Sequence, residues 1–242
     1  MSDITATPAP IASKLTAPSL RLGAISLRSA AAAALLPRSL GNVAGARRCR
    51  EYPAGPVVKI YTRKGDDGST GLWYGGRVPK SGGRPEAYGA VDEAASALGL
   101  CRAAATGAEE ELATDILRIQ NELFVAGAEL ATAPEASERL EAGVSKVTSD
   151  MVDRLESDID RYMDRVDLPP KFVIPGGSEL SARLDVARTA VRRAERRVVD
   201  LKTAGDLPDD TALRYLNRLS DALFAMARYA DEPNPKLFEG RT

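Results

Sequence analysis

Apolar residues recur at helical spacing through most of the chain beyond residue 84. Residues three and four positions apart lie on one side of a helix, so this spacing gives a segment one apolar face and one polar face. The pattern occurs in five segments, residues 85–104, 109–131, 149–166, 180–201 and 211–230. Short stretches rich in Pro, Gly and Asp separate them. We therefore predict an all-α fold, an up-and-down bundle of five helices.

The fourth segment has two opposed faces. Its apolar stripe consists of Leu180, Leu184, Ala187, Val191, Ala194, Val198 and Leu201. On another side, Arg188, Arg192 and Arg196 lie four residues apart and are therefore neighbours. Each pair of like charges costs about 0.2–0.5 kcal/mol unless an anion lies against it, and Glu195 can neutralise only one of them. A polyphosphate would satisfy this face, because guanidinium groups match phosphate oxygens. A solvated face, or one with salt bridges to another subunit, is the alternative.

A second candidate for anion binding precedes the helices. Residues 57–62 (VVKIYT) predict a short β-type segment, and a Gly- and Asp-rich loop follows over residues 65–76. Glycines allow backbone N–H groups to turn toward an anion, and the hydroxyls and cations of this loop would flank it. The loop lacks the GxxxxGK(S/T) pattern of a Walker A motif. A β-turn with solvated charges is the alternative for this segment.

Composition excludes several classes of chemistry. The 242 residues include no histidine, which removes His-based triads, a His general base and His-rich zinc or di-iron sites. Cys49 and Cys101 are the two cysteines, so we expect no disulfide framework and a reducing compartment. The net charge of −1 argues against a general nucleic-acid or membrane-surface binder. No apolar run reaches the ~18–20 residues that span a bilayer.

The first 55 residues differ in composition from the rest. They contain seven basic and two acidic residues, a local charge of +5, which leaves −6 on the remainder of the chain. Ala, Ser, Pro and Arg dominate the segment, as in a mitochondrial transit peptide. A disordered tail, or translation from an upstream start codon in a bacterial gene, is the alternative. We predict a disordered or targeting extension over residues 1–55, outside the folded domain.

Four segments of the chain stand out as motifs. In chain order they are KIYTRKGDDGSTGL, YGAVDEAASALG, IPGGSELSARLDVARTAVRRAER and YLNRLSDALFAMARYA. Together they resemble the ATP:cob(I)alamin adenosyltransferase family of the propanediol-utilisation type. The likeness covers about residues 59–230. It implies a ferritin-like, cobalamin adenosyltransferase-like bundle over residues 56–232, with a C-terminal tail over residues 233–242. It also implies a homotrimer that binds ATP and cobalamin between adjacent subunits.

The resemblance implies transfer of the 5′-deoxyadenosyl group of ATP to cob(I)alamin, which yields adenosylcobalamin and triphosphate. Cobalt(I) is itself a strong nucleophile, so the protein needs to orient the reactants and stabilise the departing triphosphate. We expect Mg²⁺ on the phosphates, a reductant for cobalamin and an adenosylcobalamin-dependent mutase as a partner. The expected location is the bacterial cytoplasm, or the mitochondrial matrix if residues 1–55 are a transit peptide. A non-catalytic ATP or cobalamin sensor or delivery module is the alternative.

The resemblance also assigns residues by motif. For ATP they are Thr62, Arg63, Lys64, Gly65, Ser69, Thr70, Lys80, Arg192, Arg193, Glu195, Arg196 and Asn217. Arg192 and Arg196 are the expected catalytic cations. Asp92 matches an acid that pairs with Arg192 across a subunit interface. For Mg²⁺ we expect hydroxyls or carboxylates of the protein to contribute at most one or two ligands, and we assign no particular residue to the metal.

On the cobalamin side, Phe124 matches the aromatic residue that lies beneath the corrin ring and displaces the lower axial base. This displacement leaves cobalt(II) four-coordinate and easier to reduce. Phe124 adjoins Leu123 and therefore lies off the inward seam of its helix, although membership of a broad apolar face is the alternative. Arg188 is expected to support this site. Phe238 is the only candidate for a second aromatic wall near the C-terminus.

Overall fold

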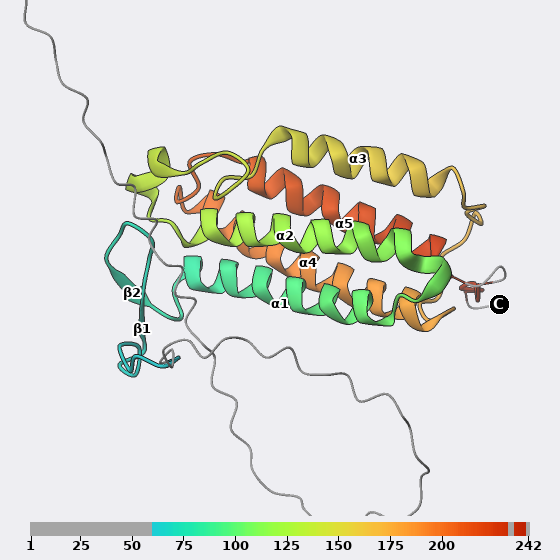
Figure 1. The fold of residues 1–242 in the computed structure, drawn as a ribbon, viewed down its shortest axis with the longest axis horizontal. Coiled ribbons are helices and arrows are strands. Elements are labelled where there is room, and N and C mark those ends of the chain that lie inside the picture. Colours follow the sequence, from blue (N-terminus) through green and yellow to red (C-terminus); the bar gives the residue numbers. More distant parts are fainter. Residues whose placement is uncertain (1–59, 232–234, 241–242) are drawn as a thin grey trace, which may run out of the picture. The chain divides into compact units, whose positions relative to one another are not determined.

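The structure, a computed structural model, describes residues 60–231 and 235–240. The chain divides into two units, of which the first ends at Arg63 and the second begins at Lys64. In the second unit five α-helices run side by side, as Figure 1 shows. They are α1 (Gly83–Ala104), α2 (Glu110–Ala131), α3 (Ser149–Met163), α4 (Glu179–Thr203) and α5 (Thr211–Tyr229). The predicted all-α five-helix bundle is confirmed. The third helix is shorter than predicted, because the chain leaves α3 in tight turns after Met163.

The helices pack through the stripes that the sequence predicts. Helix α1 lies against α2 and α4, α4 also lies against α5, and α5 against α3. Every residue of the apolar stripe of α4 is buried. Ser178 caps the start of α4, because its hydroxyl accepts a hydrogen bond from the backbone N–H of Ser181 at 3.0 Å. Packing and capping together fix which face of α4 is left outside the bundle.

Ion pairs link α3 to α2, and one of the carboxylates involved is buried. Glu122 accepts hydrogen bonds from Arg118 at 3.0 and 3.1 Å, from Arg154 at 3.2 Å and from the Tyr215 hydroxyl at 2.9 Å. Arg118 also pairs with Asp158 of α3. A buried carboxylate is tolerated only when it is fully hydrogen-bonded. This network therefore holds the outer helix in place.

The β structure lies in the glycine-rich loop instead of the predicted segment. Residues 57–59 lie outside the described residues, and the described residues 60–62 are not part of a strand. Strands β1 (Ser69–Gly71) and β2 (Arg77–Pro79) instead pair antiparallel, with Thr70 opposite Val78. A turn closes them, because the N–H of Leu72 donates to the carbonyl of Gly76 at 3.0 Å. The loop is thus a small ordered hairpin.

Arg84 ties the beginning of α1 to two other segments. Its buried guanidinium donates to the carbonyls of Leu130 and Thr132 at 2.9 and 2.7 Å, and also to the carbonyl of Asp206. These carbonyls belong to the end of α2 and to the connection between α4 and α5. One cation therefore satisfies acceptors that the helix end leaves unpaired. It holds the hairpin side of the bundle together (Figure 1).

Trp73 anchors the hairpin to the same end of the bundle. Its backbone N–H donates to the Ala131 carbonyl at 2.8 Å, and its carbonyl accepts from the Ala133 N–H at 3.0 Å. These two bonds extend the end of α2 into the loop. Trp73 therefore holds the hairpin to α2 through its backbone.

The C-terminal residues pair with the loop before α4. The Ile174 N–H donates to the Lys236 carbonyl, and the Phe238 N–H donates to the Phe172 carbonyl, both at 2.8 Å.

The predicted extension over residues 1–55, with Cys49, lies outside the described residues. Burial raises the pKa of the Cys101 thiol to about 12, so that thiol stays protonated at neutral pH. In the described part of the chain, no helix has the length and apolar character to cross a membrane.

Candidate functional site

Arg77 organises the glycine-rich loop. Its Nε donates to the Ser69 hydroxyl at 2.8 Å and its Nη2 to the Ser69 carbonyl at 3.0 Å, and the same nitrogen bonds the Lys64 carbonyl. Asp67 lies 3.5 Å from this guanidinium. Hydrogen bonds from the Ser69 backbone N–H and hydroxyl hold the pKa of the Asp67 carboxyl below its ordinary value of 3.8. The sequence analysis did not identify Arg77, although it stands beside the predicted residues.

The predicted phosphate-binding residues of the second unit lie together on this hairpin. Lys80 donates to the Gly65 carbonyl at 2.8 Å, which draws its ammonium group over the loop. A Cβ at position 65 would meet the Ser69 carbonyl oxygen and Lys80 Nζ, each at 3.1 Å, so the close approach of the Ser69 backbone favours glycine. Lys64 is exposed, while Ser69 and Thr70 are half-buried in β1. The hairpin thus gathers two ammonium groups and two hydroxyls.

Thr62 and Arg63, the other predicted residues of this motif, belong to the first unit. Both side chains are exposed, and the Arg63 guanidinium lies 5.5 Å from the centre of the Tyr61 ring. Arg63 has a φ of 59°, the left-handed region that non-glycine residues seldom occupy. This backbone conformation turns the chain immediately before Lys64.

The arginine row of α4 emerges on the polar face as predicted. Arg192 and Arg196 are exposed, and Arg188 is half-buried. Arg196 Nη1 donates to the Arg192 carbonyl at 3.0 Å. Among the described residues, neither the Arg192 nor the Arg196 side chain forms an ion pair with a carboxylate. Arg188 lies 3.4 Å from Asp185. Two of the three cations therefore face outward without a counter-ion in this part of the chain.

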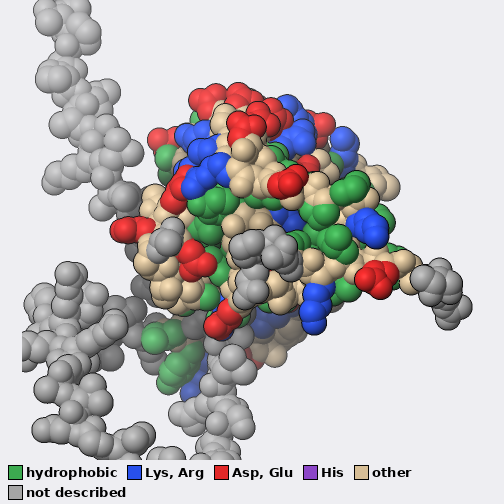
Figure 2. Space-filling model, turned by 90° about the vertical axis from the view of Figure 1, so that its right-hand side faces the viewer, with side chains coloured by type: hydrophobic (Ala, Val, Ile, Leu, Met, Phe, Trp, Pro, Cys, Tyr) green, Lys and Arg blue, Asp and Glu red, His purple; other side chains and the backbone are tan. Residues whose placement is uncertain are grey.

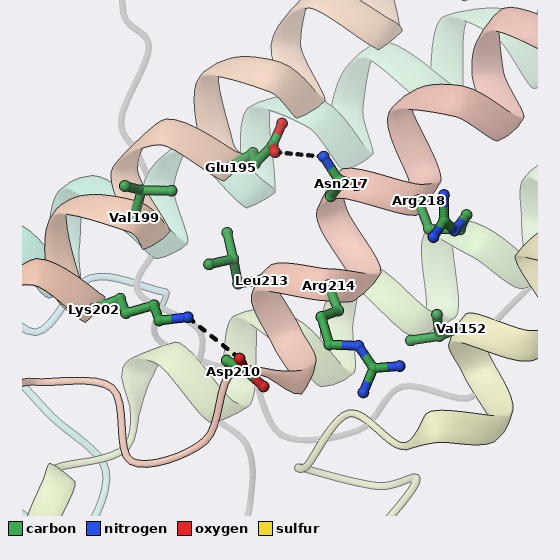
Figure 3. A pocket seen from close by; sticks show the side chains of 9 residues that line it. All are labelled: Val152, Glu195, Val199, Lys202, Asp210, Leu213, Arg214, Asn217 and Arg218. Atoms are coloured by element: carbon green, nitrogen blue, oxygen red, sulfur yellow. Dashed lines mark hydrogen bonds and ion pairs between the residues drawn. The ribbon is translucent and has the colours of Figure 1, made fainter.

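Glu195 and Asn217 meet across a hollow between α4 and α5. The Asn217 amide donates to the Glu195 carboxylate at 2.9 Å, and Figure 3 shows the two side chains directed toward each other. The hollow has a volume of about 300 Å³. Lys202 and Asp210 bridge it farther along at 3.3 Å, with Leu213 between the two polar pairs. Two residues predicted to bind the nucleotide thus line one concave surface.

Arg193 and Asp92 are placed on the α1–α4 side. Arg193 forms an ion pair with Glu93, the neighbour of Asp92. Asp92 itself is exposed on α1 and, among the described residues, pairs with no cation. In the described part of the chain, Arg192 and Asp92 form no ion pair with each other. Their predicted pairing across a subunit interface stays a prediction.

Phe124 projects from α2, with 57% of its surface exposed. The prediction that it lies off the inward seam is confirmed, because Leu123 and Val125 on either side are buried. Leu117 is exposed seven residues earlier, two helical turns away on the same face. Phe124 is therefore available to a ligand or to another subunit.

A second apolar surface lies at the far end of the bundle, and of its residues the sequence analysis identified Phe238 but not Phe172. Phe172 is 82% exposed and Phe238 59% exposed, and Ile174 and Leu168 are exposed beside them in the chain. Figure 2 views the molecule from this end and shows hydrophobic side chains at its surface. The pairing of residues 172–174 with 236–238 explains why these side chains stand out from both segments. Phe172 lies two residues before the start of the IPGG motif, which was the available signal.

No group of three or more Cys, Asp or Glu side chains in the described part of the chain is arranged to hold a metal ion. A metal that arrives on a ligand needs fewer protein donors. On the hairpin, the Asp66 carboxylate is exposed and, within the described ranges, is not engaged by a cation. It is the carboxylate oxygen donor beside the candidate phosphate-binding groups.

Comparison with known proteins gives one consistent result. The family described as Cobalamin adenosyltransferase matches residues 60–230. The corrinoid adenosyltransferase of Bacillus subtilis is 44% identical over 173 residues, which are 71% of this chain and 86% of that protein. The corrinoid adenosyltransferase PduO of Salmonella typhimurium is 45% identical over 174 residues, 72% of this chain and 50% of that protein.

Solved structures agree with these relatives. A phenylalanine-to-alanine variant of the PduO-type ATP:corrinoid adenosyltransferase from Lactobacillus reuteri, complexed with cobalamin and ATP, superposes with a TM-score of 0.69 at 35% identity. It covers 75% of this chain and 100% of that one. An arginine-to-lysine variant complexed with ATP has a TM-score of 0.64 at 37% identity and covers 71% of this chain and 93% of that one.

Proposed function

Because the chain belongs to the cobalamin adenosyltransferase family, we propose that it transfers the 5′-deoxyadenosyl group of ATP to cob(I)alamin. In this reaction the cobalt electron pair attacks C5′ of ATP. A cobalt–carbon bond forms, the bond from C5′ to the triphosphate oxygen breaks, and triphosphate leaves with that electron pair. The products are adenosylcobalamin and triphosphate. No proton transfer is required, which suits a chain without histidine.

The observation that carries this proposal is the arginine face of α4. Arg192 and Arg196 are exposed, and in the described part of the chain they have no carboxylate partner. Such a face favours the binding of an anion from outside the helix. A departing triphosphate gains negative charge in the transition state, so guanidinium groups that are already in position accelerate its departure. Lys64 and Lys80 of the hairpin supply further positive charge.

The nucleotide would extend along the row of arginines. Arg188 and Arg196 are eight residues apart, which is about 12 Å along a helix. Arg196 lies toward the hairpin end of α4, where Glu195 and Asn217 line the hollow, and Arg188 lies toward the opposite end. We place the phosphates at the hairpin end, beside Lys64 and Lys80. C5′ and the corrinoid would then lie farther along the row.

Two phenylalanines compete for the face that covers the corrin ring. Phe124 is exposed on α2, as the family motif predicts. Phe172 is more exposed and precedes the start of α4, the helix that carries Arg188. The relatives complexed with cobalamin and ATP include variants at a phenylalanine, which makes such a side chain the one to test. We retain Phe124 as the proposed residue and add Phe172, with Phe238 beside it, as its competitor.

Mg²⁺ on the phosphates fits the residues of the hairpin. Asp66 and Thr70 offer oxygen donors next to Lys64 and Lys80, and one or two protein ligands are enough for a magnesium ion that is also held by phosphates. When bound, the ion neutralises part of the phosphate charge. The protein residues hold the phosphates in one orientation.

The assembly and setting of the enzyme are part of the proposal. Asp92 and Arg192 are exposed and form no ion pair with each other among the described residues, which is compatible with their pairing across the interface of a homotrimer. A cobalamin reductant and an adenosylcobalamin-dependent mutase are the expected partners. The reaction would take place in the bacterial cytoplasm, or in the mitochondrial matrix if residues 1–55 are a transit peptide.

The decisive experiment is a turnover assay with ATP and chemically reduced cobalamin. We expect adenosylcobalamin, followed by its visible spectrum, and triphosphate in equal amounts. A sensor or delivery module would bind one or both substrates and release no triphosphate, and that outcome would overturn the proposal.

A further inference from the structure

A chain of alternating charges is buried where α4 and α5 meet. Asp185 of α4 accepts a hydrogen bond from Arg228 Nη2 at 2.7 Å. Arg228 Nε donates in turn to Asp231 at 2.7 Å. The side chains of Asp185, Arg228 and Asp231 are only 6%, 3% and 4% exposed. Three charged side chains, Asp185, Arg228 and Asp231, are thus linked one after another inside the bundle.

This buried trio carries one uncompensated negative charge, because a single guanidinium lies between two carboxylates. Unbalanced charge inside a protein is costly, so a further cation nearby is favoured. Arg188 supplies it: its Nε lies 3.4 Å from the second oxygen of Asp185, and its side chain is 29% exposed. Arg188 therefore differs from Arg192 and Arg196, whose guanidinium groups face no carboxylate in the described part of the chain.

Asp231, at the far end of the trio, lies where the end of α5 meets the loop before α4. Asp231 follows α5 and adjoins the loop before α4, where a Cβ on Gly177 would meet its Oδ1 at 2.5 Å. In the described structure this buried oxygen has no hydrogen-bond partner. The Ser178 hydroxyl donates to the Ala230 carbonyl at 2.6 Å and holds the same junction closed. Asp231 therefore joins the trio through its other carboxylate oxygen, which accepts the hydrogen bond from Arg228.

We propose that Asp185 and Asp231 are positioning residues that hold the Arg188 guanidinium for the corrinoid substrate. Asp231 does not contact Arg188; it acts through Arg228. With Asp231 ionised, Arg228 is shared between two carboxylates and Asp185 retains attraction for Arg188. Without that charge, Arg228 neutralises Asp185 alone, and Arg188 is released from its place. The inference rests on the proposed role of Arg188 at the corrinoid, and it adds residues that the family motifs do not assign.

The test removes the charge while keeping the hydrogen bond. In Asp231→Asn, the amide oxygen still accepts from Arg228 Nε. We expect cob(II)alamin, titrated by its visible spectrum, to bind about threefold or more weakly, because coupled neighbours interact by ~0.5–3 kcal/mol. ATP binding, measured by calorimetry, should not change. In an Arg188→Ala background Asp231→Asn should have no further effect. The same should hold in an Asp185→Asn background, which keeps Arg188 and remains measurable if Arg188→Ala binds too weakly.

The matched control is Asp160→Asn, an exposed carboxylate on α3, which should leave both affinities unchanged. Unchanged cob(II)alamin affinity in Asp231→Asn would overturn the proposal. So would an equal further loss in the Asp185→Asn background, or a parallel loss of ATP binding, since either indicates general loosening. Failure of the proposed function is distinguishable, because then the unsubstituted protein itself would show no turnover.

Discussion

The Glu195 carboxylate on α4 accepts a hydrogen bond from the Asn217 amide on α5, with nitrogen and oxygen 2.9 Å apart. The bond joins two helices at the rim of the hollow in Figure 3. Asn217 is exposed and Glu195 half-buried, so the pair is accessible to a ligand. The hydrogen bond from Asn217 also keeps the Glu195 carboxylate from pairing with a neighbouring arginine.

Replacing the donor by an acceptor should separate the pair. In Asn217→Asp two carboxylates would face each other, and we expect a loss of stability of about 0.5–1 kcal/mol, because the site is partly solvated. ATP affinity should fall more strongly, since added negative charge also repels phosphates. Thermal unfolding and calorimetry measure the two effects. Asn121→Asp, at an exposed amide on α2, is the control; an equal loss of ATP affinity there would contradict the prediction.

Arg196 offers the sharpest test of leaving-group stabilisation. Its guanidinium bonds only a backbone carbonyl among the described residues, so Arg196→Ala should change the free energy of unfolding by less than about 0.5 kcal/mol. Turnover should fall by about 100-fold or more, as when a donor to a developing anion is removed. The control is Arg197→Ala, which removes a cation already paired with Asp200 at 3.5 Å. Similar turnover in both variants would exclude the assigned role.

The two exposed phenylalanines can be separated by spectroscopy. The side chain that covers the corrin ring and displaces its lower base should, when replaced by alanine, leave ATP binding intact and abolish the four-coordinate spectrum of bound cob(II)alamin. We expect this loss for Phe124→Ala; the same loss in Phe172→Ala instead would place the corrin ring at the far-end surface. The other variant is then the matched control. An unchanged spectrum in both would rule out either phenylalanine as the displacing group.

Periodicity predicted the elements well because it reports burial directly. All seven apolar residues assigned to the stripe of α4 are buried, and the opposite arginines are on the polar face. Strand pairing was less accessible, because VVKIYT has β propensity, whereas in the described residues the ladder forms between Ser69–Gly71 and Arg77–Pro79. Propensity does not identify which segment meets a partner.

Long-range contacts explain what the sequence could not provide. The organising role of Arg77 depends on the fold of the hairpin, which brings its guanidinium to the Lys64 carbonyl, thirteen residues away in the sequence. The Asp185–Arg228 pair spans forty-three residues and two helices. Neither spacing follows from the 3.6-residue repeat of a single helix. The exposure of Phe172 likewise depends on its pairing with the C-terminal segment.

Glu129 makes the stability of the bundle depend on pH in a defined direction. Its carboxylate is buried and accepts the Val147 N–H at 2.7 Å, and burial raises its pKa above the ordinary value of 4.5. The folded chain therefore binds this proton more tightly than the unfolded chain. The corresponding stability is present at pH values below the unfolded-state pKa and is lost as the pH rises through the folded-state pKa.

Glu129→Gln should mimic the protonated state, because its amide oxygen still accepts from Val147 and carries no charge. We expect Tm near neutral pH to rise by about 2–4 °C, the change that ~1 kcal/mol produces in a chain of this size. Near pH 4, where the native carboxyl is protonated, the difference should nearly vanish. Thermal unfolding followed by circular dichroism at both pH values measures it. Glu138→Gln, at an exposed carboxylate, should show neither effect, and a lower Tm for Glu129→Gln at neutral pH would mean that the ionised carboxylate stabilises the bundle.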